Sequence, residues 1–214
     1  MDLLGRIADD LELGLNDDVR TLVRQAIDAR LSASTILNDG LLAGMAVVGR
    51  RFKAHEIFLP DVLLAARAMH AGLELLEPFL ASEDVRPRGT VILGTVAGDQ
   101  HDIGKTLVGI MLRGAGYEVV DLGIDVDPET FVDAALEHRA SIIGLSALLT
   151  TTMPAMGVVV RHVKERQLAG KIQTLVGGAP VTREFALEIG ADAYAYDAAS
   201  AVETVEALMD SRRC

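Results

Sequence analysis

The sequence has a single cysteine, Cys214, so no intramolecular disulfide can stabilise the chain. One free cysteine fits a reducing compartment. Basic residues are also few, because 20 Lys and Arg stand against 31 Asp and Glu, and the formal net charge is −11. This excess of negative charge argues against nucleic acid and anionic membrane surfaces as partners, since both would repel the chain.

The sequence also lacks a targeting or membrane-spanning pattern. Residues 1–4 contain no basic segment followed by an apolar one, so we expect no signal peptide. Residues 142–160 are uncharged and approach the length of a membrane span, but hydroxyl residues, a proline and glycines interrupt them. We interpret them as a strand, a loop and a helix, and we expect a soluble, cytoplasmic protein. Half of the 214 residues are hydrophobic, which is enough for a sizeable core.

Residues 1 to about 80 show helical periodicity and no strand pattern. We predict a short helix near residues 3–13 and three longer ones, which together form a four-helix bundle. The apolar faces of the longer helices are Val19, Leu22, Val23, Ala26, Ile27 and Leu31, then Leu37, Leu41, Met45, Val48 and Phe52, then Val62, Ala65, Ala66, Met69, Leu73 and Leu76. The charged stretch 81–89 contains a proline and a glycine and predicts a linker. We therefore assign residues 1–86 to a helical domain and residues 87–214 to a second domain.

From Thr90 onwards the pattern alternates between short apolar strands and helices. The predicted strands are Thr90–Thr95, Glu118–Asp121, Ser141–Ser146, Gln173–Val176 and Ala193–Ala195, and the last helix runs from about Ala198 to Asp210. Five such units predict an α/β domain of the flavodoxin type, with a parallel sheet in the order 2-1-3-4-5 covered on both faces. In that order the loops after the first and third strands lie side by side at the carboxyl edge, where such folds bind ligands.

The loop after the first strand, Gly98–Thr106, has the most unusual composition, because it contains His101 between two aspartates. Its Gly-Lys-Thr end suggests a phosphate-binding loop, but five residues separate its two glycines where that motif has four. A second interpretation is a helix start capped by one of the aspartates. A third is a metal-ligating histidine whose other ring nitrogen donates to the carboxylate of Asp99.

The motif Asp99-x-His101-x-x-Gly104 resembles the cobalamin-binding signature of methionine synthase and of the corrinoid proteins of methyltransferase systems. The resemblance implies that His101 replaces the dimethylbenzimidazole of cobalamin as the lower ligand of cobalt, and that Asp99 hydrogen-bonds to it. It also implies that Gly104 leaves room for the displaced nucleotide tail. The neighbouring residues expected to line the cofactor are Gly98, Gln100, Asp102 and Ile103.

Two later motifs extend the resemblance. Ser146-x-Leu148 matches the second family motif, and Thr152 stands where methionine synthase has a serine that hydrogen-bonds to the aspartate. The pair Gly177-Gly178 matches the third motif, which lines the tunnel of the nucleotide tail. Taken alone, these stretches fit a hydroxyl-rich helix start and a tight turn equally well. The further cofactor contacts that the resemblance implies are Ser146, Leu148, Thr150, Thr152, Gly177, Gly178, Tyr194 and Asp197.

The helical domain resembles the cap of methyl-carrying corrinoid proteins, through Gly44-Met45-x-x-Val48-Gly49-x-x-Phe52 followed by Phe58-Leu59-Pro60. Core packing alone explains Met45, Val48 and Phe52. Phe58 stands where the family has an aromatic residue that covers the methyl group on cobalt, so we expect it to contact the cofactor.

The function that the resemblance implies is that of a methyl carrier, the corrinoid component of a methyltransferase in one-carbon metabolism. Its cofactor would be cobalamin, as methylcobalamin or hydroxocobalamin, and its catalytic residues would be His101, Asp99 and Thr152. Its partners would be a substrate-specific methyltransferase, a methylcorrinoid:acceptor methyltransferase with an acceptor such as tetrahydrofolate, and a reductive activase. We expect no turnover without these partners. Two alternatives are a cobalamin-dependent sensor that acts through a partner protein and a phosphate or nucleotide binder.

Overall fold

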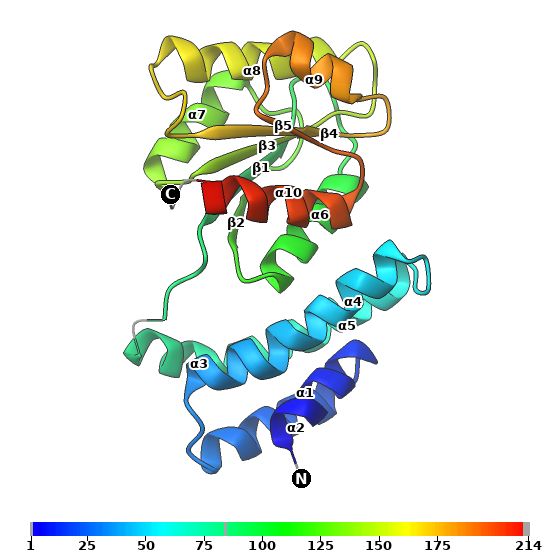
Figure 1. Cartoon of the computed structure of the whole chain (residues 1–214), viewed down its shortest axis with the longest axis vertical. Helices are drawn as coiled ribbons and strands as arrows, with labels where there is room; N and C mark the ends of the chain where they lie inside the picture. Colours follow the sequence, from blue (N-terminus) through cyan, green and yellow to red (C-terminus); the bar gives the residue numbers. More distant parts are fainter. Residues whose placement is uncertain (1, 84, 212–214) are drawn as a thin grey trace. The chain divides into compact units, whose positions relative to one another are not determined.

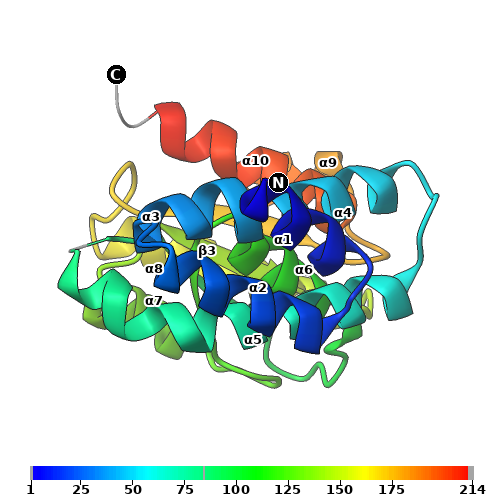
Figure 2. The ribbon, with the colours of Figure 1, turned by 90° about the horizontal axis from the view of Figure 1, so that it is seen from below.

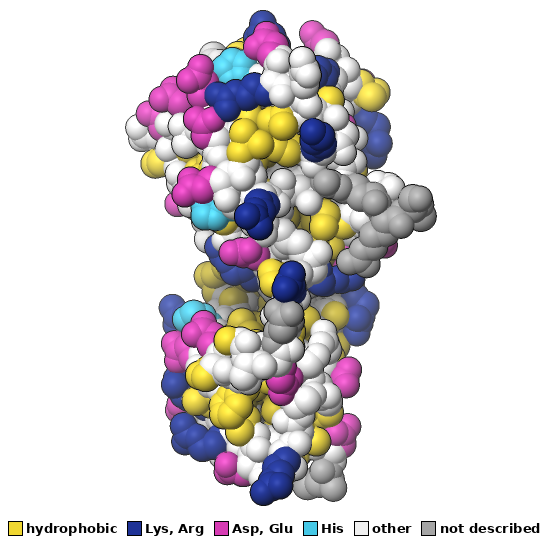
Figure 3. Space-filling model, turned by 90° about the vertical axis from the view of Figure 1, so that its left-hand side faces the viewer, with side chains coloured by type: hydrophobic (Ala, Val, Ile, Leu, Met, Phe, Trp, Pro, Cys, Tyr) yellow, Lys and Arg dark blue, Asp and Glu magenta, His cyan; other side chains and the backbone are white. Residues whose placement is uncertain are grey.

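The structure is a computed structural model that describes residues 2–83 and 85–211, so Cys214 lies outside the described residues. The chain divides into two compact units (Figure 1). The first contains the residues up to Pro87 together with Gly114–Gly116, and the second contains Arg88–Arg113 and the residues from Tyr117 onwards. Within the described ranges, every helix is too short or too polar to cross a membrane. On the face shown in Figure 3, acidic and basic side chains are interspersed over both units.

The first unit is a helical bundle, as the periodicity predicts. In it α2 lies along α5, and α1 packs against α2 and α4 (Figures 1 and 2). Its elements are α1 (Leu3–Glu12), α2 (Asn16–Asp28), α3 (Ala33–Thr35), the π-helical segment η1 (Ile36–Leu42), α4 (Ala43–Lys53) and α5 (Leu59–Ser82). The segments α3, η1 and α4 follow one another without a break and together form the third predicted helix.

The π-helical segment η1 changes which residues of the third helix face the core. Ile36 and Leu41 are both fully buried, and they lie five residues apart, which is the spacing that a π turn places on one face. Leu37, which an ideal α-helix would place above Leu41, is only partly buried. Leu31, predicted for the face of α2, lies beyond the end of that helix and is exposed, because the chain turns at Arg30 with a positive φ.

Phe58 stands at the N-cap of α5, where its backbone N–H donates to the carboxylate of Asp61 at 2.8 Å. Pro60 lies in the first turn of this helix, as its fixed φ favours. The Phe58 side chain is 67% exposed, so it adds little to the core of the bundle. Its expected contact with a cofactor stays a prediction.

The second unit contains a five-stranded parallel sheet in the predicted order β2-β1-β3-β4-β5. Helices α7, α8 and α9 cover one face of the sheet, and α6 and α10 cover the other (Figure 1). The strands are β1 (Thr90–Thr95), β2 (Glu118–Asp121), β3 (Ile142–Ser146), β4 (Gln173–Gly177) and β5 (Ala193–Ala195). The helices are α6 (Ile103–Gly114), α7 (Pro128–Glu137), α8 (Met153–Glu165), α9 (Arg183–Ile189) and α10 (Ala198–Ser211).

The core of this unit fixes the alignment of the strand ends. Central strand residues such as Ile92 and Ile143 are fully buried against Phe131 of α7 and Met156 of α8. The strand register then aligns Thr95, Ser146, Gly177 and Ala195 in one row of paired Cα positions across β1, β3, β4 and β5. The loops that follow these strands therefore begin at one edge of the sheet, and the predicted site residues of this unit lie in or next to these loops.

Candidate functional site

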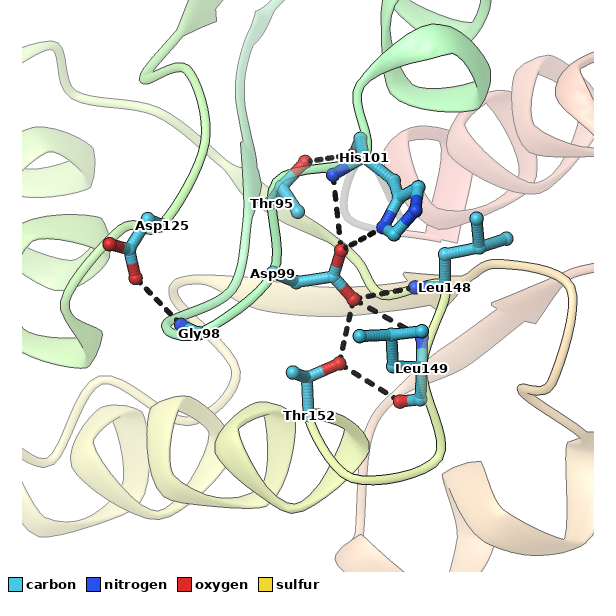
Figure 4. Close-up of polar contacts among 8 residues, drawn as sticks. All are labelled: Thr95, Gly98, Asp99, His101, Asp125, Leu148, Leu149 and Thr152. Atoms are coloured by element: carbon cyan, nitrogen blue, oxygen red, sulfur yellow. Dashed lines mark hydrogen bonds and ion pairs between the residues drawn. The ribbon is translucent and has the colours of Figure 1, made fainter.

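Asp99 and His101 form a hydrogen-bonded pair in the loop between β1 and α6 (Figure 4). The Nδ1 atom of His101 lies 2.8 Å from Oδ1 of Asp99, and the His101 backbone N–H donates to the same oxygen at 3.1 Å. The Asp99 side chain is fully buried, whereas half of the His101 side chain is exposed. The carboxylate thus holds one ring nitrogen of His101 and leaves Nε2 pointing away from it.

The second oxygen of Asp99 is held by the loop after β3. The backbone N–H groups of Leu148 and Leu149 donate to Oδ2 at 2.8 and 3.2 Å, and the Thr152 hydroxyl donates to it at 2.7 Å (Figure 4). The same hydroxyl lies 2.9 Å from the carbonyl oxygen of Leu149. Since a hydroxyl has one proton, Thr152 can direct it to Asp99 or to Leu149 but not to both.

The surroundings of Asp99 keep its side chain charged. Burial alone would raise the pKa of Asp99, but hydrogen bonds from Thr152, from the His101 side chain and from the Leu148 backbone together hold that pKa well below its usual range. A carboxylate only accepts hydrogen bonds, so Nδ1 of a neutral His101 must carry the proton. Nε2 then has a free lone pair, which is the form of imidazole that binds a metal.

The backbone of the His101 loop has two further supports that the sequence interpretation did not single out. The Thr95 hydroxyl donates to the carbonyl oxygen of His101 at 2.9 Å. Asp125, from the loop after β2, accepts from the Gly98 backbone N–H at 2.6 Å. The sequence alone gave no reason to select the Asp125 side chain.

Lys105 does not face an open phosphate site. Its side chain is 4% exposed, and its ammonium group forms an ion pair with both carboxylate oxygens of Asp121 at the end of β2. An ammonium group that is buried and already paired is a poor phosphate ligand, so the structure disfavours the phosphate-binding interpretation. Among the described residues no group of three or more His, Cys, Asp or Glu side chains could hold a metal ion.

The other predicted residues of the α/β unit lie around the row of strand ends. Gln100, Asp102, Ile103, Leu148, Thr150 and Asp197 are exposed, and Ser146, Gly177, Gly178 and Tyr194 are partly buried. The Asp197 carboxylate accepts from the Ser200 backbone N–H at 2.7 Å, so it also caps α10. Gly178 has a local reason to be glycine, because a Cβ there would lie 1.9 Å from the carbonyl oxygen of Ala147. The positions of these residues do not test their contacts with a cofactor, which stay predictions.

The site fits a large, mostly apolar group with one metal position. Ile103, two residues after His101, has an exposed apolar side chain. Leu148 and Leu149, whose backbone N–H groups donate to Asp99, also have exposed apolar side chains. At Gly104 an added Cβ would meet no atom within 4 Å, so there is open space next to the loop. An imidazole with a free Nε2, an apolar rim and this space suit a corrin with an open lower cobalt position.

Comparisons with known proteins identify the family of this chain. Residues 89–206 match a family model described as the B12 binding domain, and residues 3–77 match a second model with the same description. A corrinoid protein of Desulfitobacterium hafniense (strain Y51) is 42% identical over 212 residues, which cover 98% of each chain. Trimethylamine corrinoid protein 2 of Methanosarcina acetivorans is 45% identical over 189 residues, which cover 87% of each chain.

Two solved structures share both units. A chain of the methanol:cobalamin methyltransferase complex of Methanosarcina barkeri has a TM-score of 0.87 and 34% identity, over 97% of this chain and 80% of that one. A cobalamin-binding protein of Desulfitobacterium hafniense DCB-2 has a TM-score of 0.79 and 30% identity, over 97% of this chain and 98% of that one. The fold and these matches define a corrinoid-binding protein. The chain belongs to the family of corrinoid proteins of methyltransferase systems.

Proposed function

We propose that this chain is a methyl carrier that holds cobalamin with His101 as the lower ligand of cobalt, in place of dimethylbenzimidazole. The observation that carries the proposal is the Asp99–His101 pair, because it fixes the proton on Nδ1 and leaves the Nε2 lone pair free. When bound, cobalamin would supply a cobalt centre that takes up a methyl group and gives it up again.

The protein residues would orient the imidazole of His101 and control its protonation. Asp99 orients the ring and stabilises the imidazolium form when Nε2 is released from the metal and takes up a proton. Thr152 adjusts to that change, because its hydroxyl lies within hydrogen-bond distance of both Asp99 and the Leu149 carbonyl. The threonine thus supplies the hydroxyl of the serine found in methionine synthase, and the relay is His101–Asp99–Thr152.

The relatives support a methyltransferase as a partner in this proposal. The name of the relative from Methanosarcina acetivorans refers to trimethylamine, and the complex from Methanosarcina barkeri is named as a methanol:cobalamin methyltransferase. Since carriers with the same two units serve different methyl donors, the donor is selected by a substrate-specific methyltransferase. A second methyltransferase would pass the methyl group to an acceptor such as tetrahydrofolate, and a reductive activase would restore the reduced cofactor. The chain alone would not turn over.

The test of this proposal is the His101→Ala variant, reconstituted with hydroxocobalamin under anaerobic conditions. We expect the visible absorption spectrum of the bound cofactor to lose the signature of an imidazole ligand, and methyl transfer with the partner enzymes to fail. His138→Ala is the matched control, since His138 is exposed at the C-cap of α7 and should leave the spectrum as in the wild type. A wild-type spectrum in His101→Ala would refute the ligand assignment.

Gly104→Ala is expected to separate cofactor binding from stability. Gly104 is the second residue of α6, and an added methyl group meets no protein atom within 4 Å. Alanine is the better helix residue, so the free energy of unfolding should rise by up to about 1 kcal/mol. If the space holds the nucleotide tail, cobalamin should bind about tenfold or more weakly, because overpacking costs about 1–3 kcal/mol. Denaturant unfolding and a cobalamin titration measure the two effects, and unchanged affinity would contradict the assigned role of Gly104.

A further inference from the structure

The last residue of β2 and the loop that follows it contact the chain on both sides of His101 in sequence. Asp125 accepts a hydrogen bond from the Gly98 backbone N–H, three residues before His101, at 2.6 Å. Asp121 pairs with the ammonium group of Lys105, four residues after His101. We call residues 121–125 the β2 bracket. Because these two contacts are made by carboxylates, each is a charge-assisted bond.

Asp125 makes two hydrogen bonds to the His101 loop, one through its carboxylate as acceptor and one through its backbone N–H as donor. Its backbone adopts a left-handed conformation with φ of +53°, which is uncommon for a residue with a side chain. In this conformation its carboxylate accepts from Gly98, and its own N–H donates to the carbonyl oxygen of Asp99 at 3.0 Å. Figure 4 shows Asp125 on the opposite side of the loop from Leu148, Leu149 and Thr152.

Asp99 is consequently fixed from two sides by different parts of the sheet. Its carboxylate is held by the loop after β3, through Leu148, Leu149 and Thr152. Its backbone is held by the β2 bracket, through Asp125. If the Asp125 carboxylate were removed, the Asp99 carboxylate would stay anchored, but the peptide units between Gly98 and His101 could shift and tilt the imidazole.

We infer that Asp125 is a positioning residue for the cobalt ligand: it fixes the Gly98–Asp99 backbone and thereby the direction in which His101 presents Nε2. This inference rests on the proposed role of His101. It assigns Asp125 no contact with the cofactor. Its effect on cobalt ligation passes through the loop, so changes at Asp125 should alter how firmly the imidazole binds while leaving the imidazole in place.

The experiment compares two substitutions, of which one removes the hydrogen-bond acceptor of the side chain and the other keeps one. Asp125→Gly removes the carboxylate and tolerates the left-handed backbone, whereas Asp125→Asn keeps an acceptor oxygen and also tolerates that backbone. Asp127→Ala is the control, because the Asp127 side chain makes no capping hydrogen bond to α7 within the described residues. Each variant is studied without cofactor, by amide hydrogen exchange at Gly98, and with cobalamin, by affinity and visible spectrum.

We expect Asp125→Gly to speed exchange at Gly98 and to weaken imidazole ligation about tenfold, the ratio that one ordinary hydrogen bond sustains. Asp125→Asn should keep most of the exchange protection at Gly98 and most of the strength of imidazole ligation, and Asp127→Ala should match the wild type in both. Unchanged exchange or an unchanged spectrum in Asp125→Gly, with His101→Ala altered in parallel, overturns the role of Asp125 alone. A wild-type spectrum in His101→Ala overturns this inference together with the proposed function. Equal loss in Asp125→Gly and Asp125→Asn also overturns it, since the acceptor oxygen would then not matter.

Discussion

Replacing Gly178 by alanine is expected to prevent stable folding of the α/β unit. An added Cβ would lie 1.9 Å from the carbonyl oxygen of Ala147 and 2.9 Å from its carbonyl carbon. Both are backbone atoms that directly follow β3, and the Ala147 N–H donates to the Gly177 carbonyl oxygen at 3.3 Å, so they have little freedom to move. Gly178 also has φ of +133°, a conformation that residues with a side chain rarely adopt. Clash and backbone strain act together, and we expect a loss of more than about 4 kcal/mol in the free energy of unfolding.

Tyrosine fluorescence can follow this loss in the α/β unit alone. The sequence has no tryptophan, and its three tyrosines, Tyr117, Tyr194 and Tyr196, all lie in that unit. The Gly178→Ala chain should show tyrosine emission of an unfolded unit already in the absence of denaturant, while circular dichroism retains the helical signal of the bundle. Gly177→Ala is the matched control, since its Cβ would meet only the Ala195 carbonyl oxygen, at 3.0 Å. Equal stability of the two alanine variants would show that the contact with Ala147 is not limiting.

The contrast between Gly177 and Gly178 shows what a sequence motif leaves undetermined. In the sequence the two glycines are equivalent, and both were assigned to the nucleotide tail. In the structure one of them is required by the packing of the β3 and β4 loops, whatever ligand binds. A glycine in a sequence can indicate that there is no room for a side chain or that φ is unusual, but it does not indicate which neighbouring atoms fill that room.

Most of the fold was predictable because the strands of the sheet are short apolar runs between polar loops. The predicted bounds of β1, β2 and β5 agree with the structure, β3 begins one residue later, and β4 ends at Gly177. The helical bundle was predictable for the same reason, since each face repeats at helical spacing. The π-helical segment was not predictable from the sequence. Helical spacings of three and four residues pair Leu37 with Leu41, whereas the π-helical segment buries Ile36 together with Leu41, five residues apart.

The candidate site was predictable where side chains form it and hidden where the backbone does. Asp99, His101 and Thr152 have distinctive side chains, and the structure brings them together. The Leu148 and Leu149 amides also hold Asp99, but every residue except proline has such a group, so the sequence carries no signal for them. The contact of Asp125 with Gly98 depends on the close approach of two loops, which only the folded sheet defines.

Asp99→Asn is expected to move the proton of His101 as well as to lower stability. Every group that meets the Asp99 side chain is a donor or can be one. An asparagine must turn its NH₂ group toward some of them. Facing Leu148, Leu149 and Thr152, the NH₂ group would oppose two backbone N–H groups, while the Thr152 hydroxyl could accept from it by turning its own proton to the Leu149 carbonyl. Facing His101, it opposes the backbone N–H but can donate to Nδ1 if the ring proton moves to Nε2. The second arrangement costs less, so the substituted side chain should select the tautomer whose Nε2 has no free lone pair.

The functional consequence is loss of the metal-binding form of the imidazole while the ring itself remains. Nitrogen chemical shifts of His101 in the protein without cofactor should show the proton on Nδ1 in the wild type and on Nε2 in Asp99→Asn. With cobalamin, the spectrum of Asp99→Asn should approach that of His101→Ala. Asp102→Asn is the control, because Asp102 is exposed in the same loop. A wild-type tautomer in Asp99→Asn would show that Asp99 does not set the proton position.

The stability of Asp99→Asn should depend on pH in a way that fixes the sign of the electrostatic contribution. The pKa of Asp99 in the folded protein is lowered, because hydrogen bonds to the carboxylate outweigh its burial. Such a group stabilises the fold fully above its unfolded pKa of about 3.9, and that contribution fades as the pH falls toward the folded pKa.

At pH 7 we expect the free energy of unfolding of Asp99→Asn to be about 2–4 kcal/mol lower than that of the wild type, since at least one buried donor loses its acceptor and charged bonds become neutral. Below about pH 4 the difference from the wild type should shrink, because Asp99 takes up a proton in the unfolded wild type but stays charged in the folded form, and asparagine does not titrate. Urea unfolding followed by tyrosine fluorescence between pH 7 and pH 3 measures this gap, and a gap that widens with acid would mean that the carboxylate is destabilising where it stands.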